Sequence, residues 1–226
     1  MLPHEKEEEK RLVRQLPPGK KIEHFFRYYT IQTVAVIGCI AILAALIWNF
    51  CFRKMDKTVF SAAVYDDAFE EQYEEAFIGN LKTLFDVTDE HEIVRMEHYL
   101  SDSRQDQMKI VVMLAAQEYE VIVAGEEQFK KLAGDGCFAD LEEFLDDGTL
   151  KKADGRLFYT EGLLEAESQS LDFNGSGKGA VKAYGISLKD SPKWAELHGI
   201  CTDPVIGVFA GTTRPENALK FVDYLL

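Results

Sequence analysis

The feature that most constrains this chain is a stretch of twenty-five residues without a charged side chain, residues 28–52 (YYTIQTVAVIGCIAILAALIWNFCF). At about 1.5 Å per residue, its inner part is long enough to cross the ~30 Å hydrocarbon layer of a bilayer. Aromatic residues gather at both ends, as they do at membrane interfaces. A cleaved signal peptide would end in small residues, and a buried globular helix of this length is rarely apolar on every face. The sequence therefore predicts a single transmembrane helix over residues 30–52.

Charged residues are distributed unevenly around this segment. Residues 1–29 carry seven Lys/Arg against five Glu, whereas residues 53–226 carry eighteen Lys/Arg against thirty-four Asp/Glu. Because positively charged flanks stay on the cytoplasmic side, we expect a cytoplasmic tail over 1–29, a short linker over 53–57 and an extracellular domain over 58–226. The chain would then lie in the cell membrane. The acidity of the outer domain argues against nucleic acid as a partner.

Beyond the linker, short apolar strands alternate with amphipathic helices. Strand patterns cover residues 58–64, 91–100 and 121–123, and helical spacing follows each of them. This alternation predicts an α/β domain with a mainly parallel sheet. A further short strand is expected at RLFYT, and a closing strand and helix are expected within DPVIGVFAGTTRPENALKFVDYLL. The apolar stripe predicted for the second helix consists of Met108, Val111, Val112, Leu114 and Ala115.

Side chains at the carboxyl ends of parallel strands are the first candidates for a ligand site. Tyr65 and Tyr184 could stack on a small polar ligand, and Asp66 and Glu126 could accept its hydrogen bonds. Glu126 also suits the first turn of a helix, where a carboxylate complements the helix dipole. A ligand site and a purely structural role both stay open at this stage.

Two of the four cysteines, Cys137 and Cys201, lie in the acidic part of the chain. An oxidising exterior would permit a disulfide between them. The bond requires Cα atoms within about 7 Å of each other, and the sequence alone leaves that distance open.

The motifs that could carry chemistry do not satisfy their spacing rules. GSGKG (residues 175–179) lacks the first glycine and the final Ser/Thr of a phosphate-binding loop. His91 and His98 fall on opposite faces of a strand, and position 95 between them is Arg, so they predict no metal site. No G-x-S-x-G sequence is present. We therefore expect no catalytic residues, no metal, no cofactor and a function that is not enzymatic.

Three segments resemble extracellular solute-binding proteins with the type 2 periplasmic-binding fold. They are VIVAGEEQFKKLAGDGCFADLEEFL, AYGISL and VIGVFAGTTRPENALKFVDYLL, and the resemblance covers residues 57–226. In that family a second lobe would lie between the Tyr-Gly strand and the closing strand. Only twenty residues separate Gly185 from Val205 here, so the resemblance implies about one lobe.

The predicted transmembrane helix and the missing second lobe favour a membrane-anchored domain that acts as an accessory or protein-interaction module. The alternative is a receptor or sensor for a sugar, an amino acid or a peptide, linked to an ABC transporter. One lobe would leave such a ligand exposed on one side, so tight binding would need a covering partner.

Overall fold

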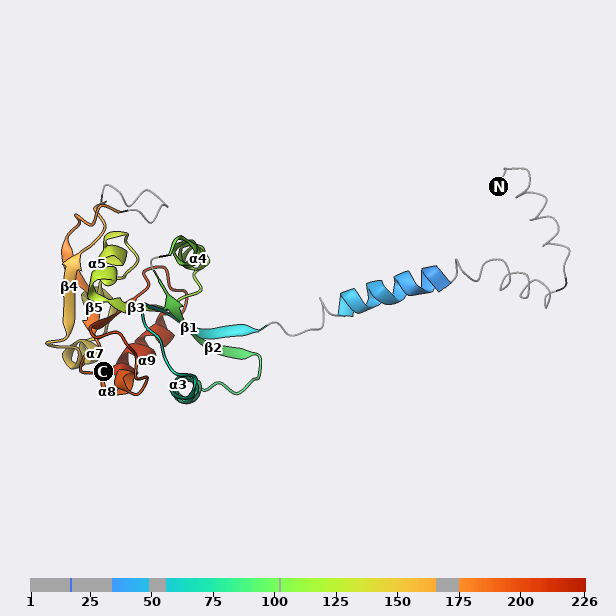
Figure 1. Ribbon diagram of the computed structural model, residues 1–226, viewed down its shortest axis with the longest axis horizontal. Helices are drawn as coiled ribbons and strands as arrows, with labels where there is room; N and C mark the ends of the chain where they lie inside the picture. The colour runs from blue at the N-terminus through green and yellow to red at the C-terminus, as the bar shows by residue number, and fades with distance from the viewer. Residues whose placement is uncertain (1–16, 18–33, 49–55, 102, 166–174) are drawn as a thin grey trace. The chain divides into compact units, whose positions relative to one another are not determined.

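The computed structural model describes residues 17, 34–48, 56–101, 103–165 and 175–226 (Figure 1). It divides into two compact units, Met1–Met55 and Asp56–Leu226. In the first unit, residues 34–48 form a helix with exposed side chains. None of the helices within the described ranges is both long and apolar enough to cross a membrane. Both ends of the predicted transmembrane segment, nearly all of the predicted tail and most of the predicted linker lie outside the described residues.

The second unit contains one six-stranded sheet with the order β2-β1-β3-β6-β5-β4. Its strands are β1 (Lys57–Tyr65), β2 (Glu92–Leu100), β3 (Val121–Gly125), β4 (Leu157–Glu161), β5 (Val181–Ser187) and β6 (Pro204–Val208). β1 is parallel to both β2 and β3, whereas β6 is antiparallel to β3 and β5, and β4 is antiparallel to β5. The α/β class is confirmed.

The sheet is mixed, so the predicted mainly parallel arrangement holds only for its first half. The physical reason lies in the link between β5 and β6. The Leu188 N–H donates to the Pro204 carbonyl at 2.8 Å, so the two ends of the link meet at one edge of the sheet. A strand that follows such a link must run back in the opposite direction, whereas parallel strands need a crossover that returns the chain to the starting edge.

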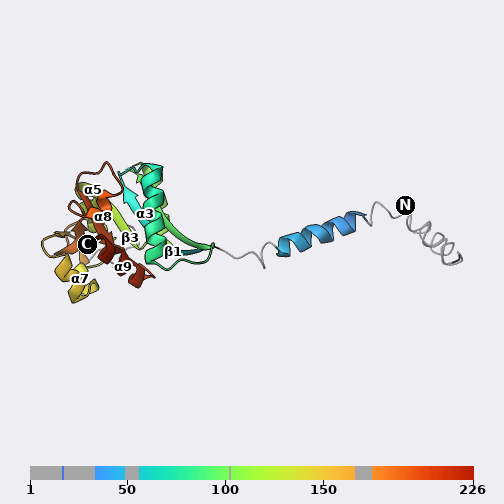
Figure 2. The ribbon, with the colours of Figure 1, turned by 90° about the horizontal axis from the view of Figure 1, so that it is seen from below.

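Helices cover both faces of this sheet. α3 (Glu71–Leu84), α8 (Pro192–Ala195) and α9 (Pro215–Leu225) pack on one face, together with the short helix α6 (Leu141–Phe144). α4 (Arg104–Ala115) and α5 (Glu126–Gly134) pack on the other, and α7 (Asp147–Lys152) precedes β4. Figure 2 brings α3, α8 and α9 into view from below. The unit is therefore a three-layer α/β domain.

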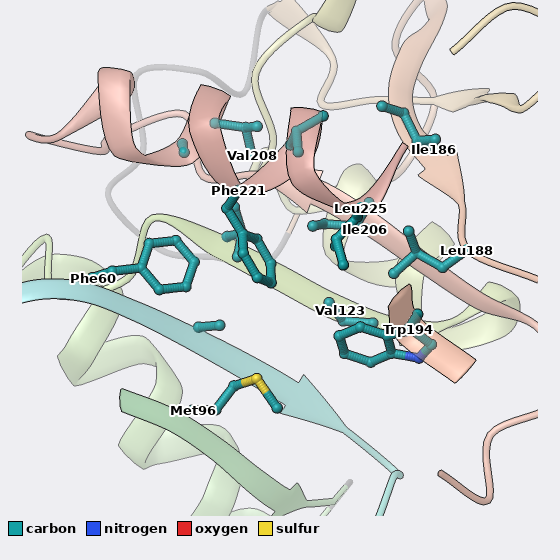
Figure 3. Close-up of a cluster of buried hydrophobic side chains, with 14 of the residues drawn as sticks. Phe60, Met96, Val123, Ile186, Leu188, Trp194, Ile206, Val208, Phe221 and Leu225 are labelled. Carbon is teal, nitrogen blue, oxygen red and sulfur yellow. The ribbon is translucent and has the colours of Figure 1, made fainter. Parts of the chain in front are cut away.

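Alternation along β1 supplies side chains to both layers. Phe60 and Val64 join the cluster under α3 and α9, while Ala63 and Tyr65 join the cluster under α4 and α5. In the first cluster the rings of Phe60 and Phe221 lie 4.6 Å apart (Figure 3). Because successive residues of a strand point to opposite faces, a strand covered on both faces is apolar at most of its buried positions.

A buried ion pair ties the chain before α9 to the sheet. Glu120 is fully buried and Arg214 Nε donates to its Oε1 at 2.5 Å. The Ser61 N–H donates to the other carboxylate oxygen at 2.5 Å. Arg214 also donates to the carbonyls of Thr58 at 2.6 Å and Glu118 at 3.1 Å. Burial raises the pKa of Glu120, and the bonds from Ser61 and Arg214 act against that rise.

Candidate functional site

An open depression lies where the carboxyl ends of β1 and β3 meet. β1 and β3 are parallel neighbours, α5 begins directly after β3, and the loop before β6 arrives at the same edge because β6 is antiparallel to β3. The depression has a volume of about 400 Å³. It is lined by Asp66, Gly125, Glu126, Glu127, Gln128, Cys201, Thr202 and Asp203. The structure therefore brings two of the predicted site residues, Asp66 and Glu126, to one surface.

Asp67 holds one wall of this depression in place. Its side chain is 2 % exposed, and its Oδ1 accepts hydrogen bonds from the backbone N–H groups of Ala68 at 2.9 Å, Ile200 at 2.6 Å and Cys201 at 3.1 Å. The neighbouring Asp66 has a φ of 50°, in the left-handed region that aspartate tolerates better than most residues. The sequence did not reveal this role of Asp67, because Ile200 and Cys201 are more than 130 residues away in sequence.

Half of the residues that line the depression are acidic, namely Asp66, Glu126, Glu127 and Asp203. Lys130 Nζ lies 3.6 Å from Glu126, and Lys189 Nζ lies 2.9 Å from Asp203. The bond from Lys189 holds the pKa of Asp203 below its usual range. Oxygen acceptors of this kind suit a solute rich in N–H or O–H donors. Within the described part of the chain, no group of three or more His, Cys, Asp or Glu side chains could hold a metal ion.

The two tyrosines predicted for the site lie elsewhere. Tyr65 is 2 % exposed and its side chain packs in the cluster under α4 and α5, so it presents no face to a ligand. Tyr184 lies in the middle of β5, where its hydroxyl would be 2.2 Å from a Cβ added to Gly162. The sequence gives the strand but not where the strand ends, and the carboxyl end of β5 is Ser187. Neither tyrosine lines the depression, and Tyr65 has no exposed face on which a ligand could stack.

Cys137 and Cys201 are free thiols. The Sγ of Cys201 lies 3.6 Å from the position of a Cβ at Gly125, at the start of α5, whereas Cys137 follows the end of that helix. A nine-residue helix is about 13 Å long, well beyond the reach of a disulfide. Burial raises the pKa of the Cys137 thiol to about 12, which keeps it protonated and unreactive.

A second surface feature is an exposed apolar stripe on α4, which we define as Met108, Val111, Val112 and Ala115. The side chains of Met108, Val111 and Val112 are 63 %, 42 % and 62 % exposed, and Ala115 is exposed as well. The sequence predicted that these four residues and Leu114 would pack inward. The structure buries Leu114, together with Ile110, and leaves the other four exposed.

Polar contacts explain the rotation of α4. The Lys109 ammonium lies 2.9 Å from Glu97 of β2, and the Tyr119 hydroxyl donates to the same carboxylate at 2.6 Å. At the start of the helix, Ser103 accepts from the Asp106 N–H as an N-cap. Lys109 must therefore point toward the sheet edge. A helix turned in this way directs the α4 stripe to the surface.

The chain matches no protein-family model, no curated protein and no solved structure. The likeness to solute-binding proteins therefore rests on sequence patterns alone. The two surfaces that could bind a ligand or a partner are the depression and the α4 stripe.

Proposed function

We propose that this protein is a membrane-anchored extracellular domain, similar to one lobe of a solute-binding protein, that acts as a non-enzymatic accessory module by binding another protein chain. The observation that carries the proposal is the α4 stripe. Scattered exposed apolar side chains are normal, but a contiguous set on one face marks interaction sites. Turning α4 so that valine and methionine face water costs hydrophobic free energy, which a partner would recover.

The proposed anchor rests on the uncharged segment at residues 28–52, since the helix of residues 34–48 described within it is too short by itself to cross a membrane. That helix exposes apolar side chains along its whole length, from Val34 at 63 % to Trp48 at 68 %. Lipid is the solvent that suits a helix which is apolar on every face. The basic flank before it supports the proposed orientation, with residues 58–226 outside the cell.

The shape of the depression also favours a partner protein over a solute alone. β5 and β6 are joined by residues 188–203, and no further lobe stands over the carboxyl edge of β1 and β3 in the described part of Asp56–Leu226. Small-molecule sites usually bury most of the ligand surface. An open depression would hold a solute weakly unless a second chain closed over it.

A second candidate function is a receptor or sensor for a small polar solute, namely a sugar, an amino acid or a peptide delivered to an ABC transporter. It is supported by the meeting of Asp66 and Glu126 in the depression. Thermal unfolding against a panel of such solutes tests it, because a ligand at a hundred times its Kd adds about 2.7 kcal/mol of stability. A response that Asp66→Asn with Glu126→Gln abolishes would favour this candidate.

The experiment for the module is photo-crosslinking in cells that produce the full chain. A photoreactive amino acid replaces Val112 on α4 or, as the control, Val181 on β5, since both valines are 62 % exposed. We expect a crosslinked protein chain from position 112 and not from position 181. Equal products from both positions, or no product from either, would contradict the proposal.

A further inference from the structure

We propose that the α4 stripe binds the α4 stripe of a second copy of this chain, so that two α4 helices pair in antiparallel orientation. This rests on the proposed function, since it names the partner that the module binds. The stripe residues occupy positions 108, 111, 112 and 115, the i, i+3, i+4, i+7 spacing of one helix face. Such a face is the unit that packs helix against helix.

The stripe is complementary to itself about a two-fold axis. An axis that passes between Val111 and Val112 places Met108 opposite Ala115 of the second copy, and Val111 opposite Val112 of the second copy. Each end of the pair therefore sets a long side chain against a small one. This arrangement fills space without a clash, whereas a parallel pair would set Met108 against Met108.

The charge pattern also favours a second copy on this face. The chain has a net charge of −14, so most approaches between two copies bring carboxylates together. Residues 107–117 contain no carboxylate, and their one cation, Lys109, already lies 2.9 Å from Glu97. Antiparallel pairing also opposes the two helix dipoles favourably.

The area involved sets the conditions under which the pair forms. One helix face buries on the order of a few hundred Å² per chain, less than the ~800 Å² per partner of a standard stable interface. The dimer is therefore weak in dilute solution. It forms when copies are concentrated side by side, which the proposed membrane anchor would achieve.

The test is disulfide trapping between two full-length chains that carry different tags. One chain carries Met108→Cys and the other Ala115→Cys, and both are produced in the same cells and oxidised mildly in isolated membranes. Both positions are exposed, so neither substitution disturbs the core. In the antiparallel pair positions 108 and 115 meet, whereas two copies of position 108 are about 10 Å apart along the axis, beyond the reach of a disulfide.

We expect the mixed disulfide to exceed both homodisulfides, and to exceed the product of two Val181→Cys chains, which measures random collision. The unsubstituted chain measures the background from its four native cysteines. A mixed product no greater than the Val181 control overturns the dimer, and an excess of the Met108 homodisulfide overturns the antiparallel geometry. If position 112 photo-crosslinks to a different protein while the mixed disulfide is absent, the dimer fails and the interaction module stands. If both signals are absent, both proposals fail.

Discussion

Replacing Arg214 by Met would expose the role of the buried ion pair in this fold. The substitution keeps the length of the side chain but removes three hydrogen bonds, to Glu120 and to the carbonyls of Thr58 and Glu118. Glu120 would remain fully buried with only the Ser61 N–H as a partner. An uncompensated buried charge is the main cost of such a change.

The magnitude follows from the burial of the two partners. Breaking a buried pair costs about 3–5 kcal/mol. Because the Arg214 side chain is 25 % exposed, water can replace part of its contribution, so we expect the lower end, about 3 kcal/mol. For a domain of this size each kcal/mol shifts Tm by about 2–4 °C. The expected fall in Tm is therefore about 6–12 °C.

The assay is urea and thermal unfolding of Asp56–Leu226, followed by circular dichroism. A double variant, Arg214→Met with Glu120→Gln, keeps an oxygen acceptor for the Ser61 N–H but removes the charge, so it should be more stable than the Arg214→Met variant.

The pH dependence of stability gives a second check. Burial raises the folded-state pKa of Glu120, and loss of Arg214 raises it further. The penalty is therefore full at neutral pH and shrinks as pH falls through that raised pKa. A loss of unfolding free energy below about 1 kcal/mol for Arg214→Met would refute the reasoning. So would a double variant whose loss equals the sum of the losses measured for Arg214→Met and Glu120→Gln separately.

Two further predictions test the contact between Glu97 and helix α4 and the wall of the depression that Asp67 holds in place. Burial raises the pKa of Glu97, but hydrogen bonds from Tyr119 and Lys109 and the nearby charges of Arg95 and Lys109 together lower it, so this group contributes stability that is lost as pH falls through its lowered folded-state pKa. Urea midpoints measured from pH 7 to pH 3 should therefore fall less steeply for Glu97→Gln than for the unsubstituted domain, and parallel curves would contradict this. Gly199→Ala would place a Cβ 2.5 Å from the carboxylate of Asp67, so we expect a loss of about 1–3 kcal/mol in urea unfolding. An unchanged midpoint would show that the loop yields without cost.

Most of the domain's elements could be predicted because their signals are local. The apolar run of β1, the Ser103 cap of α4 and the Pro215 start of α9 each depend on neighbours in sequence. The junction of β3 and α5 could also be predicted from the sequence, since a buried strand leads through Gly125 directly into a helix with two glutamates in its first turn. That Asp66 and Glu126 lie near each other follows in the same way, from the rule that parallel strands share a carboxyl edge.

The features that could not be predicted depend on contacts between residues far apart in sequence. The direction of β6 depends on the link after β5 folding back on itself, and the burial of Tyr65 depends on which helix covers its face of the sheet. The wall built on Asp67 joins residues that lie far apart in the chain. None of these partners leaves a periodic trace in sequence, so composition and spacing could not reveal them.

The orientation of α4 shows this division most clearly. The sequence by itself determined that a helix forms after Ser103 and that it carries apolar residues around most of its circumference. Only the tertiary structure decided which of them face the core, because the burial of Ile110 and Leu114 and the contact of Lys109 with Glu97 form only when the helix packs on the sheet. A helix with two apolar faces can pack either one inward, and contacts with the neighbouring strands select between them.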